Sequence, residues 1–288
     1  MAENARNLGV RLRPHAKMHK SADVARAQIS RGAVGVCCQK VSEAEALIDS
    51  GINDILITNQ AVGETKLDRF SQLSMRADIS ICVDNSQNIE DLNTSAAKFG
   101  TRLDILVEVD VGGGRCGVQP GARVLELAKQ IESSTYLNFR GLQAYQGGVQ
   151  NIRSFTERKN AIELVSNVVA ETVALLNNHG ISCEHVTGAG TGTWQFEGAS
   201  KIFTELQAGS YAFMDADYAR NENADGELIS DFGQSLFVYT TVMSMPNSEY
   251  VVVDAGLKCL AFDQGMPIVT DDLTVNYHQP SDEHGVLD

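Results

Sequence analysis

The sequence lacks several features that define large classes of proteins. Its 288 residues contain no apolar run long enough to span a bilayer and no signal-peptide pattern. The 23 lysines and arginines are outnumbered by 37 aspartates and glutamates, which gives a formal net charge of −14. Nucleic acids and anionic membranes bind proteins with positive surfaces, so we expect neither as a partner.

The chain also lacks the paired cysteine spacings that are typical of disulfide frameworks. Its six cysteines are scattered and no CxxC pair occurs among them. Such an arrangement is not a disulfide framework, so we expect reduced thiols, most of them small buried side chains. A reducing compartment favours a cytoplasmic protein.

What the sequence does contain is a repeating unit of a short β-branched run, a polar or glycine-containing loop and a helical stretch. Eight alternating strand candidates predict an α/β protein of parallel βαβ units. A TIM-type (β/α)₈ barrel is favoured over an open doubly wound sheet, because every strand candidate ends in a chemically useful residue and a barrel gathers all these ends in one site. The strand candidates are 10–14, 33–38, 54–58, 79–84, 103–110, 137–145, 181–188 and 203–209.

The pattern changes after about residue 234, where β-like segments follow one another without helices. We therefore predict a barrel domain over 1–234 and the start of an all-β domain over 235–288. The segment MAENARNLG resembles the last turns of a helix, and SDEHGVLD stops where a β-domain should continue. We expect the chain to be a fragment of a longer protein.

The first strand carries an unusual basic run, RLRPHAKMHKS. Because side chains alternate along a strand, Arg11, Arg13, His15 and Lys17 share one face, which we expect to point into the barrel mouth. Lys20 falls at the start of the next helix and should face solvent. Lys17 at the top of this row, among other cations, should have a lowered pKa, as a Schiff-base lysine does. A row of anion-binding or solvated cations is the alternative.

The second signal is the glycine-rich loop HVTGAGTGTW after the seventh strand. Its glycines leave backbone amides free to surround an anion, and barrels often hold a phosphate in this loop. A phosphate loop and an inward lysine in one barrel together indicate pyridoxal 5′-phosphate. The loop residues concerned are Gly188, Gly190 and Gly192, with Thr187, Thr191 and Thr193 as hydroxyl donors.

Three further loops complete the predicted site. Arg115 lies in VDVGGGRCG after strand five, and Tyr145 lies in GLQAYQGG at the end of strand six. An aromatic ring stacks on a planar cofactor and an arginine bonds its ring nitrogen, although Tyr145 is equally compatible with ordinary barrel packing. Gly209 and Ser210 follow strand eight.

Taken together, these motifs resemble the D-threonine aldolase, 3-hydroxy-D-aspartate aldolase and D-serine dehydratase group. The motifs are RPHAKMHKS, GVCCQKVSEAEA, LVEVDVGGGRCGV, LQAYQG, TGAGTGT, ELQAGSYAFMDADY and VDAGLK. The group consists of fold-type III pyridoxal-phosphate enzymes, so the resemblance implies an alanine racemase-like barrel followed by a partial β-domain, and a homodimer. It implies Lys17 as the catalytic residue, and cofactor contacts from Lys17, Gln39, Arg115, Tyr145, Thr187, Gly190, Thr191, Gly192, Gly209 and Ser210.

Within that group, AYQG, KMHKS, MDADY and SDEHG are closer to 3-hydroxy-D-aspartate aldolases, and Gln146 carries most of the distinction. The resemblance implies a lyase that cleaves 3-hydroxy-D-aspartate to glycine and glyoxylate, with His15 and Gln146 against the substrate. It also implies a divalent metal (Mg, Mn or Zn) on a histidine and an aspartate or cysteine beyond residue 288. We therefore expect no metal ligand within this chain.

Three alternatives stay open at this stage. The same site also suits a D-threonine aldolase. It suits a dehydratase that removes the β-hydroxyl of D-serine or 3-hydroxyaspartate as water. A barrel that binds pyridoxal phosphate without catalysis is an alternative of another class.

Overall fold

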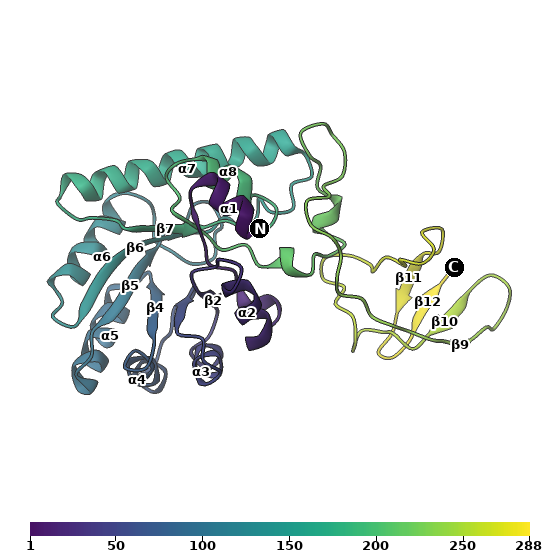
Figure 1. The fold of residues 1–288 in the computed structure, drawn as a ribbon, viewed down its shortest axis with the longest axis horizontal. Helices are drawn as coiled ribbons and strands as arrows, with labels where there is room; N and C mark the ends of the chain where they lie inside the picture. Colours follow the sequence, from purple (N-terminus) through teal and green to yellow (C-terminus); the bar gives the residue numbers. More distant parts are fainter. The chain divides into compact units, whose positions relative to one another are not determined.

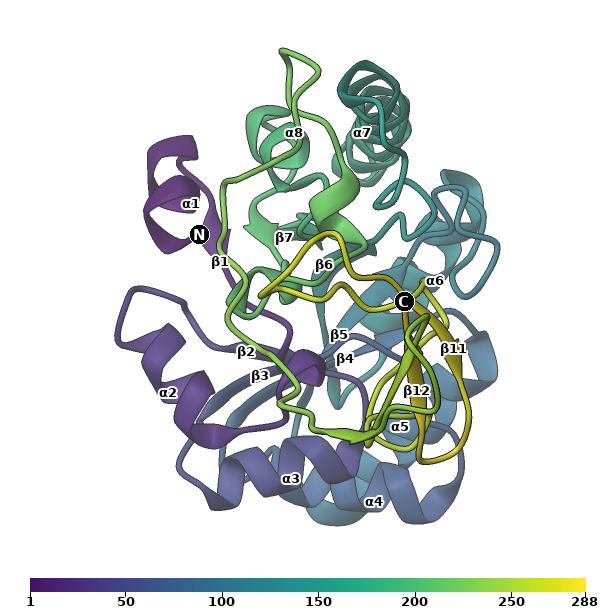
Figure 2. The same ribbon diagram turned by 90° about the vertical axis from the view of Figure 1, so that its right-hand side faces the viewer.

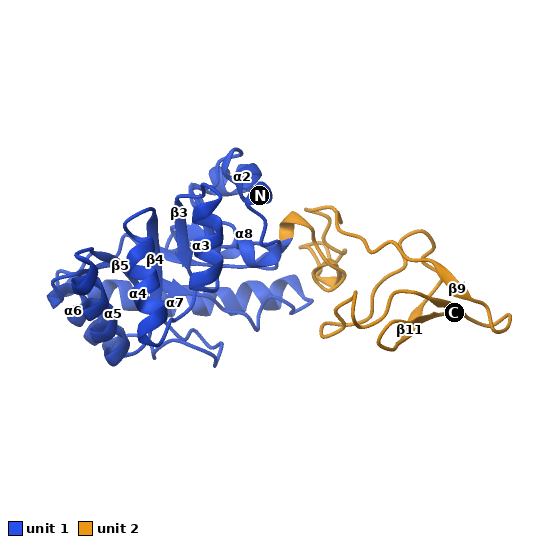
Figure 3. Ribbon diagram, turned by 90° about the horizontal axis from the view of Figure 1, so that it is seen from below, with its two compact units in different colours: residues 1–210 blue, residues 211–288 orange.

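The computed structural model describes residues 1–288, which form two compact units, 1–210 and 211–288 (Figure 3). Each unit is described by itself below. No helix in either unit combines the length and the apolar character needed to cross a membrane.

The first unit is built on eight parallel strands in the order β1-β8-β7-β6-β5-β4-β3-β2. The edges of β1 and β2 are joined as well, since the Val34 amide donates to the Leu12 carbonyl and the Cys37 amide to the Pro14 carbonyl, each at 2.9 Å. The predicted barrel is thereby confirmed. Its strands are β1 (Arg11–Leu12), β2 (Val36–Cys38), β3 (Asp54–Ile57), β4 (Asp78–Val83), β5 (Leu103–Glu108), β6 (Leu137–Ala144), β7 (His185–Gly188) and β8 (Glu205–Leu206).

Helices surround these strands on the outside (Figures 1 and 2). Seven of them connect consecutive strands, and α1 precedes β1 and packs against β1 and α8. α1 thus occupies the gap in the ring that is left because no α-helix follows β8. The helices are α1 (Ala2–Leu8), α2 (Ala22–Ile29), α3 (Val41–Asp49), α4 (Glu64–Leu73), α5 (Ser86–Phe99), α6 (Ala122–Ser133), α7 (Phe155–Asn178) and α8 (Trp194–Ala199).

Local sequence sets the helix ends. α5 begins after Asn85, whose side-chain oxygen accepts the Gln87 amide at 2.8 Å, and it ends at Gly100 in the left-handed conformation (φ 65°). The long α7 begins after Ser154, whose hydroxyl oxygen accepts the Glu157 amide. An N-cap side chain and a left-handed glycine each satisfy backbone groups that the helix itself leaves unpaired.

The apolar core lies between the strands and the helices, where outward strand residues such as Ile55, Ile81 and Val107 are buried. The barrel interior is different. A small apolar layer of Cys37, Leu56, Cys82 and Leu106 forms a separate cluster there. Polar side chains fill the remaining interior, so the inward face of the strands carries chemistry at both ends of the barrel.

The second unit contains a four-stranded antiparallel sheet in the order β11-β12-β10-β9. A small core of Val253, Ala255 and Tyr277 supports it, and the Tyr277 hydroxyl donates to the Ala255 carbonyl at 2.6 Å. This is the all-β character predicted for the C-terminal region. The strands are β9 (Val242–Ser244), β10 (Val251–Val253), β11 (Tyr277–Pro280) and β12 (Gly285–Leu287).

Candidate active site

The inward side chains of β1 and of the residues after it lie at different ends of the barrel. Arg13 lies near the N-terminal ends of the strands, where its Nε donates to Glu205 at 3.0 Å and its Nη1 pairs with Asp54. Burial opposes the charge of Arg13, but the two carboxylates outweigh it and raise the pKa of the guanidinium. The sequence predicted Arg13 at the mouth. The structure differs because the acids that neutralise it stand at the first residues of β3 and β8.

A hydrogen-bonded chain continues from Glu205 through the barrel interior. The Thr187 hydroxyl donates to Glu205 at 3.1 Å and accepts from Gln207 at 2.8 Å, and Gln207 is bonded in turn to Gln143. All four side chains are buried. The Thr187 hydroxyl therefore belongs to the interior network, and Thr187 lies in β7, directly before the glycine loop to which its sequence motif assigned it.

Lys17, Tyr145 and Arg115 meet at the C-terminal ends of the strands. Lys17 lies on the 3₁₀ turn η1 (Ala16–Met18) that follows β1, and its Nζ is 5.9 Å from the centre of the Tyr145 ring. The Arg115 guanidinium is 5.8 Å from the same ring centre. A cavity of about 120 Å³ is lined by Arg115, Tyr145 and Glu108, among others. Three loops that are distant in sequence thus bring an amine, an aromatic face and a guanidinium together.

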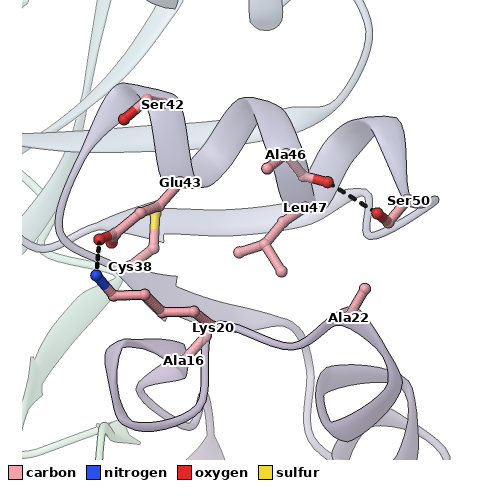
Figure 4. A pocket seen from close by; sticks show the side chains of 9 residues that line it. All are labelled: Ala16, Lys20, Ala22, Cys38, Ser42, Glu43, Ala46, Leu47 and Ser50. Carbon is pink, nitrogen blue, oxygen red and sulfur yellow. Dashed lines mark hydrogen bonds and ion pairs between the residues drawn. The ribbon is translucent and has the colours of Figure 1, made fainter.

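The electrostatic setting of Lys17 differs from that of its neighbour Lys20. The Lys17 side chain reaches solvent, yet partial burial of its amine and the Arg115 charge lower its pKa. Lys20 instead extends outside the barrel to Glu43 of α3, with Nζ and Oε1 3.2 Å apart (Figure 4). A lysine with a lowered pKa has more of its amine in the neutral, nucleophilic form, and Lys20 is held in an ion pair instead.

His15 lies beneath Lys17 and is buried. Its Nδ1 accepts the Lys17 backbone amide at 3.3 Å, and its Nε2 lies 2.9 Å from both Thr58 Oγ1 and Gln39 Nε2. Burial and the charges of Lys17 and Arg115 hold the pKa of the imidazole well below its usual range. Because Nδ1 accepts, the proton of the neutral ring lies on Nε2, where it can be donated to Thr58 Oγ1, whereas the Gln39 amide nitrogen is itself a donor and makes only a close contact.

Glu108 stands behind Arg115 at the end of β5. Its Oε1 is 3.8 Å from the Arg115 Nη2, and its Oε2 accepts a hydrogen bond from Gln60 Nε2 at 2.6 Å. Burial raises the pKa of this carboxyl group. Glu108 thus gives the exposed Arg115 side chain an oriented partner at the edge of the cavity.

Gln146 is buried and uses both ends of its amide within the protein. Its Nε2 donates to the Val111 carbonyl at 3.2 Å, and its Oε1 accepts the Gly148 amide at 2.8 Å. These bonds connect the loop after β5 to the loop after β6. Arg115 and Tyr145 are carried by the same two loops, so Gln146 helps to fix their separation.

In the glycine loop and in the segment after β8, the backbone of individual glycines lies very close to neighbouring residues. A Cβ on Gly190 would stand 2.3 Å from Gln150 Oε1, and a Cβ on Gly209 would stand 2.6 Å from the His15 carbonyl oxygen. Gly192 donates its amide to Gln150 at 3.1 Å, and Thr191 beside it is buried. Ser210 follows Gly209 and begins a 3₁₀ turn. Only glycine fits at Gly190 and Gly209 without displacing a neighbour.

Several site residues carried no recognisable sequence signal. Thr58, Gln60 and Glu108 stand at strand ends on the inward parity, so only the alternation pattern could have indicated them. Gln150 and Glu197 support the glycine loop from the segment after β6 and from α8. No spacing in the sequence relates these two residues to the loop before the fold brings them together.

Comparison with known proteins is in keeping with this geometry. The family model for the alanine racemase N-terminal domain matches residues 1–217, and a model for a serine dehydratase domain matches residues 235–288. The 3-hydroxy-D-aspartate aldolase of Paracoccus denitrificans is 47% identical, over 100% of this chain and 76% of that protein. The chain belongs to the alanine racemase-like family that contains these aldolases. The resemblance inferred from the motifs is confirmed.

Two further relatives lie at the same level of similarity. The D-threonine aldolase of an Arthrobacter species is 48% identical, over 96% of this chain and 73% of that protein. The crystal structure of D-threonine aldolase from Filomicrobium marinum matches with a TM-score of 0.96 and 47% identity, over 100% of this chain and 76% of that one. This alanine racemase-like family is pyridoxal-phosphate-dependent.

The residues at the barrel mouth fit that cofactor. The Lys17 amine and the Arg115 guanidinium lie 5.9 Å and 5.8 Å from the centre of one aromatic ring, that of Tyr145, and the glycines Gly190 and Gly209 are packed closely against Gln150 and His15. These are the group types that hold an aldehyde-bearing aromatic ring and a phosphate. By contrast, no group of three or more His, Cys, Asp or Glu side chains within residues 1–288 is arranged to hold a metal ion.

Proposed function

We propose that the protein is a pyridoxal-phosphate-dependent aldolase that cleaves a D-3-hydroxy amino acid, with 3-hydroxy-D-aspartate as the preferred substrate. The observation that carries the proposal is the meeting of Lys17, Tyr145 and Arg115 at the barrel mouth, in a chain 47% identical to a 3-hydroxy-D-aspartate aldolase. The reaction breaks the Cα–Cβ bond of the substrate and yields glycine and glyoxylate.

In this proposal Lys17 provides the amine that attaches the cofactor, and its lowered pKa keeps part of that amine neutral. Bound pyridoxal phosphate would accept the negative charge that develops at the substrate α-carbon when the bond breaks. Arg115 supplies a permanent positive charge and hydrogen-bond donors beside the Tyr145 ring. Buried, neutral His15 positions the Lys17 backbone by accepting its amide.

The phosphate group is assigned to the loop 188–193 together with Gly209 and Ser210. Gly209 packs against His15, two residues before Lys17, so the segment after β8 lies beside the lysine turn. Thr187 is left out of this contact set because Glu205 and Gln207 occupy its hydroxyl.

Preference for 3-hydroxy-D-aspartate requires the site to recognise a second carboxylate. We assign part of that preference to Gln146, which holds the loops of Arg115 and Tyr145 at their spacing. A Gln146→His variant should shift that spacing and reduce the ratio of hydroxyaspartate cleavage to D-threonine cleavage.

A dehydratase is the second candidate, because residues 235–288 match a serine dehydratase domain. Product analysis separates the two. Purified protein with pyridoxal phosphate is incubated with 3-hydroxy-D-aspartate, D-threonine or D-serine, each with and without Mn²⁺ or Mg²⁺. Glycine with glyoxylate or acetaldehyde supports the aldolase. Ammonia with a 2-oxo acid supports the dehydratase, and no product in any arm, with cofactor bound, supports a binding protein.

A further inference from the structure

A buried carboxyl group stands behind the glycine loop, and its ionisation has not entered the proposed reaction. Glu197 on α8 is 1% exposed. Its Oε1 accepts a hydrogen bond from the Thr193 hydroxyl at 2.8 Å, while its buried Oε2 has no hydrogen-bond partner. Burial raises the pKa of this group to about 7. A carboxyl left half-satisfied in the interior is costly when ionised.

Thr193 connects this carboxyl group to the loop. Its hydroxyl oxygen accepts from Gln150 Nε2 at 2.8 Å and lies 3.5 Å from the Gly190 amide nitrogen. Gln150 Oε1 in turn accepts the Gly192 amide at 3.1 Å. A change at Glu197 therefore reaches the amides of both glycines through a single hydroxyl group.

The groups packed around Glu197 offer it no compensating cation. Directly after β6, Tyr145 has its phenol pKa raised by burial and, against the opposing charge of Arg115, further by Glu197. On α7, the Arg158 guanidinium donates to backbone carbonyls, those of Gly192, Ile152 and Arg153. On the sides of α1 and β8, the neighbouring Gly198 meets the apolar Leu8 and Leu206.

We propose that Glu197 takes up a proton when a phosphate group binds in the loop 188–193, and so acts as a positioning residue for that loop. A bound phosphate brings between one and two negative charges to the loop, and a carboxylate behind the same loop would repel it. Protonation removes this repulsion. The Glu197 O–H can then donate to the Thr193 oxygen in place of the long Gly190 contact, which leaves that amide and the Thr193 hydroxyl hydrogen free to turn toward the bound anion.

The proposal rests on the proposed phosphate site, so its test must separate the two. Inorganic phosphate is the first probe, because it lacks the aldehyde that reacts with lysine, and pyridoxal phosphate is the second. Each is titrated into the cofactor-free full chain by calorimetry at about pH 8, in two buffers with different ionisation enthalpies, which gives the protons taken up. The same titrations are made on Glu197→Gln as the matched isostere.

The wild type should take up close to one proton per phosphate at about pH 8 and far less at about pH 6. Glu197→Gln should show none of this uptake from inorganic phosphate and bind it roughly tenfold more tightly than the wild type at about pH 8, one unit above the pKa. For pyridoxal phosphate, the difference in uptake between the two proteins should again be about one proton.

Equal proton uptake in the wild type and Glu197→Gln overturns the role of Glu197. So does an affinity that falls equally at both pH values in the variant, as a purely structural residue would cause. The phosphate site itself is tested by Gly190→Val, which should lose phosphate binding. If Gly190→Val binds phosphate as the wild type does, or if the wild type binds none, the loop assignment fails and this inference fails with it.

Discussion

Two cations of the segment that follows β1, Arg13 and Lys17, have opposite surroundings at the two ends of the barrel interior. At the N-terminal end, Arg13 is buried between Glu205 and Asp54 and its charge is neutralised. At the C-terminal end, Lys17 has a second cation, Arg115, across the Tyr145 ring and reaches solvent. Both residues belong to the same face of the same segment. The guanidinium at one end is paired with two carboxylates, whereas Lys17 at the other end has no carboxylate hydrogen-bonded to it, in keeping with the reactive role proposed for it.

The largest effect should come from removing the reactive cation. Lys17→Ala is expected to abolish the visible absorption of covalently attached cofactor and to lower aldol cleavage by at least about a thousandfold. Lys20→Ala is the matched control, because Lys20 pairs with Glu43 outside the barrel and should retain both signals. If the Lys20 change bleaches the protein while the Lys17 change does not, the assignment of the lysine is wrong.

A change at the N-terminal end, where Arg13 is paired, should lower the stability of the protein and leave its visible absorption unchanged. Arg13→Met leaves the buried Glu205 with only the more exposed Arg11, 3.5 Å away, as a cation, which is expected to lower the free energy of unfolding by about 3 kcal/mol. Adding Glu205→Gln should recover part of that loss, since the buried carboxylate is then neutral and the remaining unpaired charge, Asp54, is partly exposed. Urea unfolding measures both variants. A single variant as stable as the wild type would show that Arg13 does not hold this end together.

Glu197 should make stability depend on pH. Its pKa is about 7 in the folded protein, against an ordinary value of 4.5. Between these values the folded state holds a proton that the unfolded state has released, so stability falls as pH rises from about 4.5 to about 7. Glu197→Gln lacks this loss and should be more stable than the wild type by up to about 3 kcal/mol at about pH 8. The margin should shrink toward about pH 5, as chemical unfolding at both pH values would reveal.

The smallest effect concerns the cation opposite Lys17. Arg115→Gln removes a positive charge that lowers the Lys17 pKa, so that pKa should rise. Less of the amine is then neutral near neutrality, and the pH profile of cofactor attachment should move to higher pH, with a rate change below about tenfold at neutral pH. Arg115→Lys keeps the charge and should leave the profile in place. Identical profiles for the wild type and Arg115→Gln would show that Arg115 does not act on Lys17.

Much of the fold was predictable because it depends on local pattern. Alternating strands and helices gave the barrel, and the alternation of side chains placed Arg13, His15 and Lys17 on one inward face. The position of each residue along the barrel axis, at its N-terminal or its C-terminal end, was not predictable. The partners of Arg13 are 41 and 192 positions away in sequence, and only the folded sheet brings Asp54 and Glu205 beside it.

The residues of the candidate site were likewise predictable only where they belong to a local sequence motif. Glycine motifs indicated the loop 188–193 because glycine conformations leave a sequence signature. Gln150 and Glu197 were missed because a lone glutamine and a lone glutamate on a helix look like ordinary surface residues. Gln150 is buried because the loop after β6 folds onto the glycine loop, and Glu197 is buried where α8 packs against α7 and β8, so both burials depend on the tertiary structure.

The most direct test of the contrast between the two ends is to identify the lysine that carries the cofactor. The protein loaded with pyridoxal phosphate is reduced with borohydride, which fixes the cofactor to its lysine, and is then digested and mapped by mass spectrometry. The adduct should appear on Lys17, with Lys20 unmodified in the same digest. An adduct on Lys20 or on any other lysine, with Lys17 unmodified, would contradict the account.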